Sequence, residues 1–191
     1  FEMMNATGTT EALALVEGIA QRYDDVQVPQ KLKSLNGAPF NIAYLQTWTQ
    51  EGVGHIQFNR PDAMNALNET MVSQLGEAFA QMEQDDAVKG IVLSGRGKAF
   101  VAGADVKFFV QQMKKKDIDR IVDFAANGQK IFRQIDTCEK PVICQLDGLS
   151  LGGGSELALA CDYIIATSKG TIGFPETGIG IYPGLGGTQR S

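Results

Sequence analysis

Short apolar segments alternate with segments of helical spacing along most of this chain. The runs VKGIVLSG at 88–95, KPVICQLDG at 140–148 and CDYIIAT at 161–167 have the length and composition of buried strands. Between the first two runs, residues 119–136 repeat apolar side chains at helical spacing. Because strands that alternate with helices form a sheet covered by those helices, the sequence predicts an α/β domain.

A hairpin and a capped helix are predicted ahead of these strands. IAYLQTWT and VGHIQF alternate around Glu51-Gly52, which is a strong hairpin signal. Asn68 can cap a helix that runs to about Gln84. The apolar stripe of this helix would consist of Met71, Leu75, Ala78, Phe79 and Met82.

The first forty residues have a different character. EALALVEGIAQRY at 11–23 predicts an amphipathic helix, and the following stretch, with Pro29, Gly37 and Pro39, predicts an extended connection. We therefore expect two parts, a helical appendage in residues 1–40 and an α/β domain in residues 41–191.

Composition excludes several classes of protein. With 43% hydrophobic and 20% charged residues, the 191-residue chain can bury an ordinary globular core. A net charge of −5 argues against a nucleic-acid surface, and no membrane span or signal peptide is visible. Three cysteines without metal-ligand spacing predict a reduced, cytoplasmic protein with no metal site.

Two familiar motifs are incomplete. Gly148-Leu149-Ser150-Leu151-Gly152 matches the serine-hydrolase pattern, but the single histidine, His55, precedes the serine instead of following it. A serine hydrolase therefore remains open only if a further segment supplies the base. Gly95-Arg96-Gly97-Lys98 is followed by Ala99 and lacks the spacing of a phosphate loop, and no complete G-x-G-x-x-G occurs.

Two carboxylates flanked by glycines are the strongest candidates for chemistry. Glu156 follows the triple glycine of LGGGSELALACD, and Glu176 lies in FPETGIGIYPGLGGTQR. Backbone N–H groups at such a turn can stabilise an oxyanion, and two nearby carboxylates can deliver one proton while removing another. We expect burial and mutual repulsion to couple the pKa values of such a pair.

These blocks carry a family resemblance. FVAGADVK, DGLSLGGGSELALACD and FPETGIGIYPGLGGTQR, with RPDAMNALN before them, resemble the enoyl-CoA hydratase/isomerase (crotonase) family. The resemblance covers roughly residues 42–191. It implies an α/β fold, a crotonase-like spiral of ββα units, with the family's C-terminal helices missing from this chain.

The resemblance also implies roles for individual residues. The N–H groups of Ala102 and Gly153 would hold a thioester oxygen. Glu156 would assist attack of water on the β-carbon, Glu176 would supply the α-proton, and Gly184 would help position the water. The acyl-CoA path would be lined by Ala63, Gly103, Ala104 and Asp105, although Asp105 also suits the cap of the following helix.

The implied reaction is syn addition of water to a 2-enoyl-CoA, giving a 3-hydroxyacyl-CoA in fatty-acid β-oxidation or a related pathway. Two retained glutamates favour a hydratase over an enoyl-CoA isomerase, which stays open together with a non-catalytic acyl-CoA-binding module. No metal or redox cofactor is implied, since backbone donors polarise the thioester. The implied partners are acyl-CoA and further copies of the parent protein.

The first 35 residues carry a second resemblance, to the end of the C-terminal helical domain of 3-hydroxyacyl-CoA dehydrogenases. It implies a fusion in which a dehydrogenase precedes the hydratase. NAD would then bind only in an upstream domain that lies outside this sequence.

Overall fold

The protein is described by a computed structural model that covers residues 1–191. It divides into two compact units, Phe1–Ile42 and Ala43–Ser191. No helix in the chain combines the length and the apolar character needed to cross a membrane.

The first unit contains three helices, α1 (Glu2–Thr7), α2 (Thr9–Ala20) and α3 (Gln30–Ser34). Helix α2 corresponds to the expected helix at 11–23. The expectation of a wholly extended segment after it is wrong, because α3 begins directly after Pro29, and the first turn of a helix does not need the missing proline N–H. The side chain of Asn5 connects the beginning of the unit to its end. Its Oδ1 accepts a 2.7 Å hydrogen bond from the N–H of Phe40, and its Nδ2 donates to the carbonyl of Phe40 at 2.8 Å.

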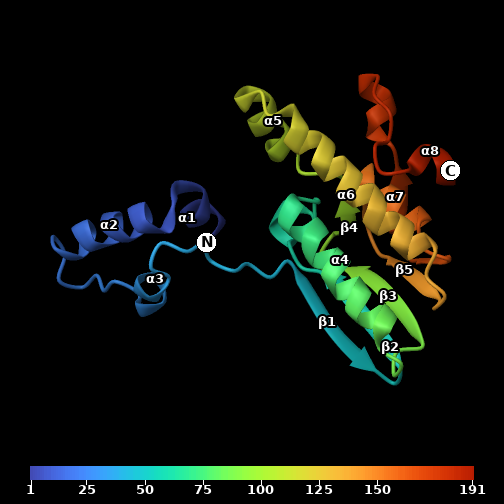
Figure 1. Ribbon diagram of the computed structural model, residues 1–191, viewed down its shortest axis with the longest axis horizontal. Helices are drawn as coiled ribbons and strands as arrows, with labels where there is room; N and C mark the ends of the chain where they lie inside the picture. The colour runs from blue at the N-terminus through green and yellow to red at the C-terminus, as the bar shows by residue number, and fades with distance from the viewer. The chain divides into compact units, whose positions relative to one another are not determined.

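The second unit is built on two sheets (Figure 1). The five-stranded sheet has the order β1 (Leu45–Gln50), β2 (Val53–Phe58), β3 (Gly90–Gly95), β5 (Val142–Leu146) and β7 (Tyr163–Ala166). The three-stranded sheet has the order β4 (Ala99–Ala102), β6 (Leu149–Leu151) and β8 (Thr171–Gly173). All pairs are parallel except β1 and β2.

Consecutive strands alternate between the sheets, which gives the unit its spiral form. The pairs β3–β4, β5–β6 and β7–β8 each place one strand in each sheet. The helices that follow are α5 (Val106–Lys115) and α6 (Ile118–Asp136), then α7 (Gly153–Leu159), then the 3₁₀ turn η2 (Pro175–Ile179) and α8 (Gly187–Arg190). The expected spiral of ββα units is confirmed.

The predicted hairpin and capped helix are also confirmed. Glu51 and Gly52 both have positive φ, as a two-residue turn between twisted strands requires. His55 of β2 stacks on Trp48 of β1 at 4.7 Å between ring centroids, which agrees with a packing role for this histidine. Helix α4 (Glu69–Gln84) begins after Asn68, whose Oδ1 accepts a 2.8 Å hydrogen bond from the N–H of Met71.

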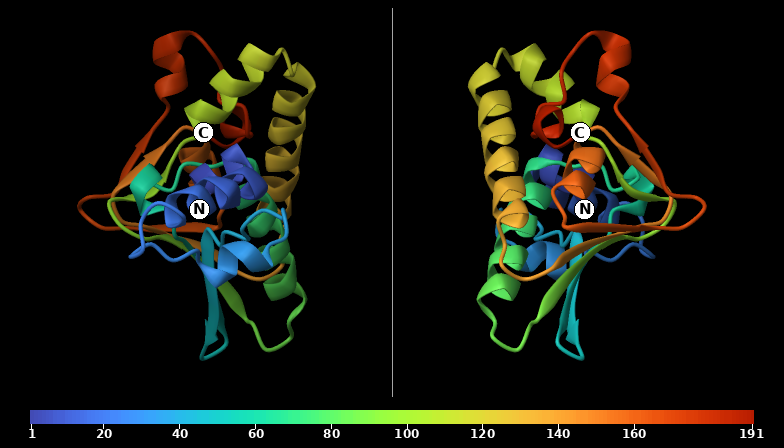
Figure 2. Two further views of the ribbon diagram at one scale, coloured as in Figure 1. Left: turned by 90° about the vertical axis from the view of Figure 1, so that its left-hand side faces the viewer. Right: turned by 90° about the vertical axis from the view of Figure 1, so that its right-hand side faces the viewer.

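Helices α4 and α6 lie side by side on the same side of the strands (Figure 2). They approach closely because Gly76 of α4 has no side chain to meet Ile131 of α6. Strand β7, in contrast, was expected to be buried, and that expectation is wrong. It is the last strand of its sheet and pairs only with β5, which leaves Tyr163 and Ile165 more than 60% exposed.

Asn65 holds the loop before α4 against the start of β4. It is fully buried, and its Oδ1 accepts a hydrogen bond from the N–H of Arg60 at 2.8 Å. Its Nδ2 lies 2.9–3.1 Å from the carbonyl oxygens of Arg96, Ala99 and Phe100. Its φ of 56°, close to the 49° of Met64, is one that asparagine tolerates better than most residues.

Replacing this buried amide should destabilise the second unit. We expect Asn65→Ala to lower the free energy of unfolding by about 2 kcal/mol or more, since several buried backbone groups lose their partner. The matched control is Asn59→Ala, which removes one exposed contact to Arg96 and should cost about 0.5 kcal/mol or less. Urea denaturation measures both, and equal losses would contradict this account of Asn65.

Candidate active site

The segment before α4 pairs with the segment that follows β4. Leu67 donates to the carbonyl of Gly103 and accepts from the N–H of Asp105, both at 2.8 Å. This bridge brings together the segments that contain Ala63 and residues 102–105; their role along an acyl-CoA path stays a prediction. Leu67 thus bonds to the carbonyl of the residue before Ala104 and to the N–H of the residue after it. In such a parallel pairing, the N–H of Ala104 itself points away from Leu67.

Asp105 has a structural role. Its Oδ1 accepts the N–H of Lys107 at 3.0 Å and so caps α5, while its Oδ2 pairs with Arg60 at 2.8 Å. Both carboxylate oxygens are engaged by the protein, and its backbone N–H donates to Leu67, so the acyl-CoA contact expected for Asp105 stays a prediction.

The role expected for Ala102 is wrong. Its N–H donates to the carbonyl of Met64 at 3.0 Å and is not available to a ligand. Two residues further on, the N–H of Ala104 has no partner in the protein and lies 4.0 Å from where a Cβ on Gly153 would stand. Gly153 is the first residue of α7, so its N–H has no acceptor within the helix.

The glycines before and after Gly153 permit this approach. A Cβ on Gly154 would overlap the carbonyl oxygen of Val101 in β4, so α7 starts directly on the strand backbone. Gly152 has φ +48°, and a Cβ there would overlap the carboxylate of Glu176. The triple glycine therefore brings strand, helix and carboxylate into contact.

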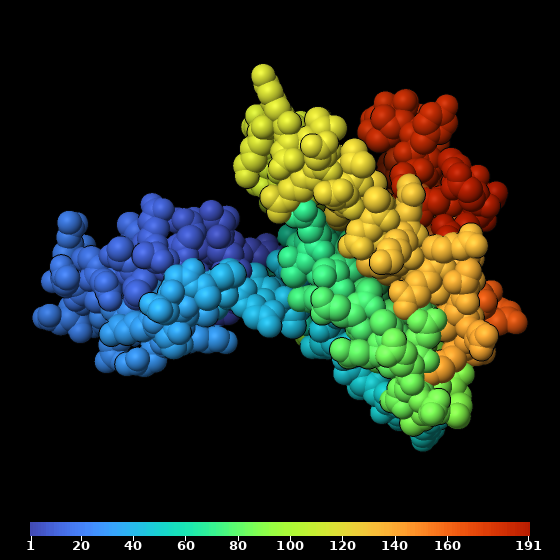
Figure 3. Space-filling view, viewed as in Figure 1, coloured from blue at the N-terminus to red at the C-terminus, as the bar shows by residue number.

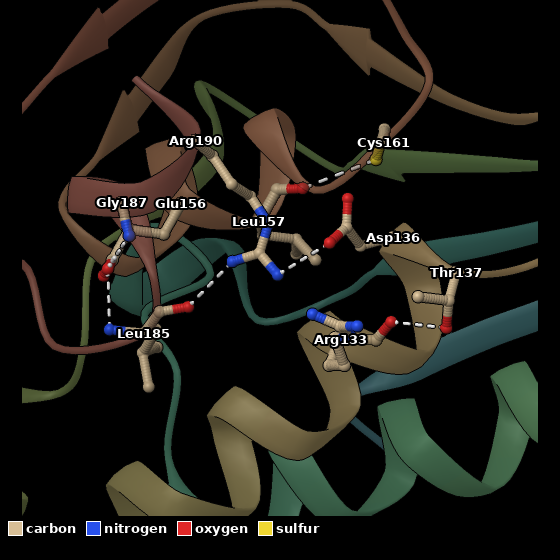
Figure 4. Close-up of polar contacts among 9 residues, drawn as sticks. All are labelled: Arg133, Asp136, Thr137, Glu156, Leu157, Cys161, Leu185, Gly187 and Arg190. Atoms are coloured by element: carbon tan, nitrogen blue, oxygen red, sulfur yellow. Dashed lines mark hydrogen bonds and ion pairs between the residues drawn. The ribbon is translucent and has the colours of Figure 1, made fainter.

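Glu156 lies in the first turn of α7 and is 1% exposed. Its Oε1 accepts two backbone hydrogen bonds, from Leu185 at 2.6 Å and from Gly187 at 2.8 Å (Figure 4). Burial raises the pKa of Glu156, the two amides oppose that rise, the charge of Glu176 adds to it, and Arg190 lowers it. The charge of Glu176 thus contributes to the raised pKa of Glu156.

Glu176 reaches the same place from η2. Its Oε2 is buried and has no hydrogen-bond partner in the protein, while its Oε1 lies against Gly152. The structure therefore places a second carboxylate, with one unengaged oxygen, beside the turn that carries Glu156. A buried polar atom without a protein partner is suited to bind a water or a ligand.

Ser155 links the two carboxylate segments, and the sequence analysis missed it. Its Oγ lies 2.7 Å from the carbonyl of Ser150 and 2.9 Å from that of Gly173, and it accepts the N–H of Gly173 at 3.1 Å. Ser155 precedes Glu156, and Gly173 lies three residues before Glu176. Nothing in the sequence around this helical serine signals that its side chain contacts the backbone of two strands.

The amides that orient Glu156 were missed too, because backbone groups in a glycine-rich loop carry no residue-type signal. Gly184, expected to position a water, lies one residue before them. Its carbonyl accepts a 2.7 Å hydrogen bond from Gln129 of α6, and its part in holding water stays a prediction.

Residues between Phe174 and Ser191 line a cavity of about 480 Å³. The glutamates are not part of its lining, but Phe174 and Pro183, which are, both lie against Gly187. In Figure 3 the α5 region and residues 174–191 project on either side of a hollow at one end of the second unit. Ala104 directly precedes the residue that caps α5, and Glu176 belongs to the C-terminal segment.

Comparisons with known proteins show the family of this chain. A family model described as Enoyl-CoA hydratase/isomerase matches residues 48–191. The chain is 45% identical over 142 residues to a crotonyl-CoA hydratase of Syntrophomonas wolfei, covering 74% of this chain and 53% of that protein. It is 42% identical over 139 residues to a short-chain-enoyl-CoA hydratase of Clostridium acetobutylicum, covering 72% and 52%.

A solved structure of an enoyl-CoA hydratase from Bacillus anthracis superposes with a TM-score of 0.71 at 31% identity, covering 78% of this chain and 57% of that one. Together with the spiral of ββα units, these matches place the chain among the crotonase-fold proteins. It belongs to the enoyl-CoA hydratase/isomerase family. The chain spans about half the length of the relatives it matches.

The raised pKa of Glu156 has a consequence for stability. The stabilisation from the neutral carboxyl is complete below its ordinary pKa of 4.5 and is lost as the pH rises through the higher folded-state value. Glu156→Gln cannot ionise and escapes this loss. We expect the stability of the variant relative to wild type to increase between about pH 4 and about pH 8 in urea denaturation. A difference that does not change with pH would contradict the raised pKa.

Proposed function

We propose that the protein is an enoyl-CoA hydratase that adds water syn across the double bond of a 2-enoyl-CoA. The observation that carries the proposal is the pair Glu156 and Glu176, which lie at one buried turn beside two unengaged backbone amides. The names of the relatives, crotonyl-CoA hydratase and short-chain-enoyl-CoA hydratase, support a short 2-enoyl-CoA as substrate. The product would be a 3-hydroxyacyl-CoA of β-oxidation or a related pathway.

The amides of Ala104 and Gly153 would bind the thioester carbonyl. Two N–H donors directed at this oxygen withdraw electrons from the conjugated double bond and make the β-carbon electrophilic. They also stabilise the enolate oxygen that develops when water adds. The proposal requires no metal or redox cofactor, because these donors supply the polarisation.

The two glutamates would move the protons. Glu156 is held through Oε1, which leaves Oε2 to accept a proton from the water as its oxygen bonds to the β-carbon. Glu176 would deliver a proton to the α-carbon. The carboxylate of Glu176 borders Gly152, and its charge acts on the carboxyl of Glu156, so we expect oxygen and hydrogen to reach the same face of the double bond.

An isomerase is the nearest alternative, and the family description includes it. Moving a double bond transfers a proton between carbons and needs no positioned water, so a single carboxylate suffices. A non-catalytic acyl-CoA-binding module is the alternative from another class. Crotonyl-CoA separates the three. A hydratase converts it to 3-hydroxybutyryl-CoA with loss of the enone absorbance, whereas neither an isomerase nor a binding module forms that hydroxy product.

Removing either carboxyl should slow hydration. We expect Glu156→Gln and Glu176→Gln each to lower kcat by about 10²–10⁴-fold with a small change in KM, since proton transfer is lost while the amides remain. The double variant should fall by less than the product of the two single effects. Steady-state kinetics with crotonyl-CoA measure this, and a wild-type rate in either single variant would overturn its assignment.

The amide of Gly153 can be tested without touching a side chain of the site. Gly153→Pro removes the N–H at a helix position that accepts proline and should lower kcat about 10²–10³-fold. Gly153→Ala is the matched control, because it adds a Cβ in nearly the same place, 3.1 Å from Leu185, but keeps the donor. Equal kinetic losses in two folded variants would count against an oxyanion role.

Assembly and location complete the proposal. We expect a homo-oligomer in the cytoplasm, with acyl-CoA as the small-molecule partner and no nucleic acid or membrane. Light scattering of the protein at its natural length measures the first of these.

A further inference from the structure

Arg190 connects the loop that orients Glu156 to the end of helix α6. Its Nη2 pairs with Asp136, the last residue of α6, at 3.3 Å, and its Nη1 donates to the carbonyl of Leu185 at 3.3 Å (Figure 4). The side chain is only 14% exposed, and a Cβ on Gly186 would overlap Nη1. The guanidinium therefore packs against the backbone of the loop.

The loop that orients Glu156 runs from Leu185 to Gly187, and little regular secondary structure fixes its position. Gly186 has φ +103°, and α8 after it is a single turn. One support is the side chain of Leu185, which lies against Gly128 of α6 and Gly153 of α7. Gln129 of α6 holds the neighbouring carbonyl of Gly184, and Arg190 donates to the carbonyl of Leu185 itself.

We propose that Arg190 is a positioning residue of the catalytic site. By fixing the loop to α6, it keeps the amides of Leu185 and Gly187 directed at Oε1 of Glu156, so that Oε2 faces the reacting water. The residue acts through the loop and contacts no substrate atom. Its catalytic consequence rests on the hydratase function proposed above.

The charge of Arg190 acts in the same direction as its contacts. The groups that shift the pKa of Glu156 are Glu176 from η2, Arg190 from α8 and the two loop amides, and burial is the largest cause. Arg190 and the amides favour the charged carboxylate, while burial and Glu176 oppose it. Losing Arg190 should therefore raise the pKa of Glu156 further and reduce the fraction of it that is ionised, and so able to accept a proton, at neutral pH.

Kinetics of four variants test the proposal. We expect Arg190→Gln to lower kcat by about 10–100-fold with little change in KM, and to move the acid limb of the kcat profile to higher pH. Arg190→Lys keeps the charge but cannot contact Leu185 and Asp136 at once through two guanidinium nitrogens. We therefore expect kcat to fall, with a smaller shift of the acid limb than in Arg190→Gln. Asp136→Asn should lower kcat less than Arg190→Gln, because the contact to Leu185 remains.

Arg133→Gln is the matched control, since Arg133 lies exposed on α6 one turn before Asp136 and makes no ion pair. It should leave both kcat and the acid limb at wild-type values. Wild-type kcat and an unmoved acid limb in Arg190→Gln would overturn the proposal, as would an equal effect of Arg133→Gln.

A titration that needs no substrate separates this inference from the hydratase proposal. ¹³C NMR of glutamate-labelled protein, with Glu156→Gln to assign the signal, reports the Glu156 carboxyl directly. Its titration should move to higher pH in Arg190→Gln and by a smaller amount in Arg190→Lys. If Arg190→Gln folds poorly, the shift in Arg190→Lys still tests the role of Arg190. An unchanged titration overturns the role of Arg190, whereas a shifted titration in a protein without hydratase activity overturns only the proposed function.

Discussion

The contact between the start of α7 and the backbone of β4 determines the geometry of the rest of the site. The position of Gly154 has no room for a side chain, because the carbonyl of Val101 occupies that space. This contact brings the free amide of Gly153 beside that of Ala104 and places Glu156 one turn further along the helix. At Gly152 the same lack of a side chain admits the carboxylate of Glu176. Donors and carboxylates meet because three consecutive residues have no Cβ.

Burial of Glu156 has an energetic cost that the surrounding elements partly offset. An isolated carboxylate in such a place would become neutral. The amides of Leu185 and Gly187 and the charge of Arg190 favour its ionised form, while burial and Glu176 resist it. This opposition keeps the carboxyl able to exchange a proton, as general acid–base catalysis requires. Hence the C-terminal loop is as much part of the site as the glutamates themselves.

Features set by local chemistry were predictable from the sequence. The turn at Glu51-Gly52 and the cap at Asn68 depend on a few neighbouring residues, and both glutamates were recognised from their glycine-rich surroundings. Features set by strand pairing were not. The donor was assigned to Ala102 because the sequence does not reveal that Met64 accepts its N–H, and β7 was expected to be buried because the sequence does not reveal which strand ends the sheet. Contacts through backbone groups or a distant arginine, as at Leu185 and Arg190, leave no local pattern to read.

The central claim is that both carboxylates serve one face of a thioester whose oxygen is held by backbone donors. Hydration of crotonyl-CoA in D₂O, followed by NMR analysis of the product, tests it most directly. The account predicts a 3-hydroxybutyryl-CoA with one deuterium at C2, in the syn relation to the new hydroxyl, and a single configuration at C3. An anti product, a mixture of diastereomers, or hydration without deuterium at C2 would contradict it.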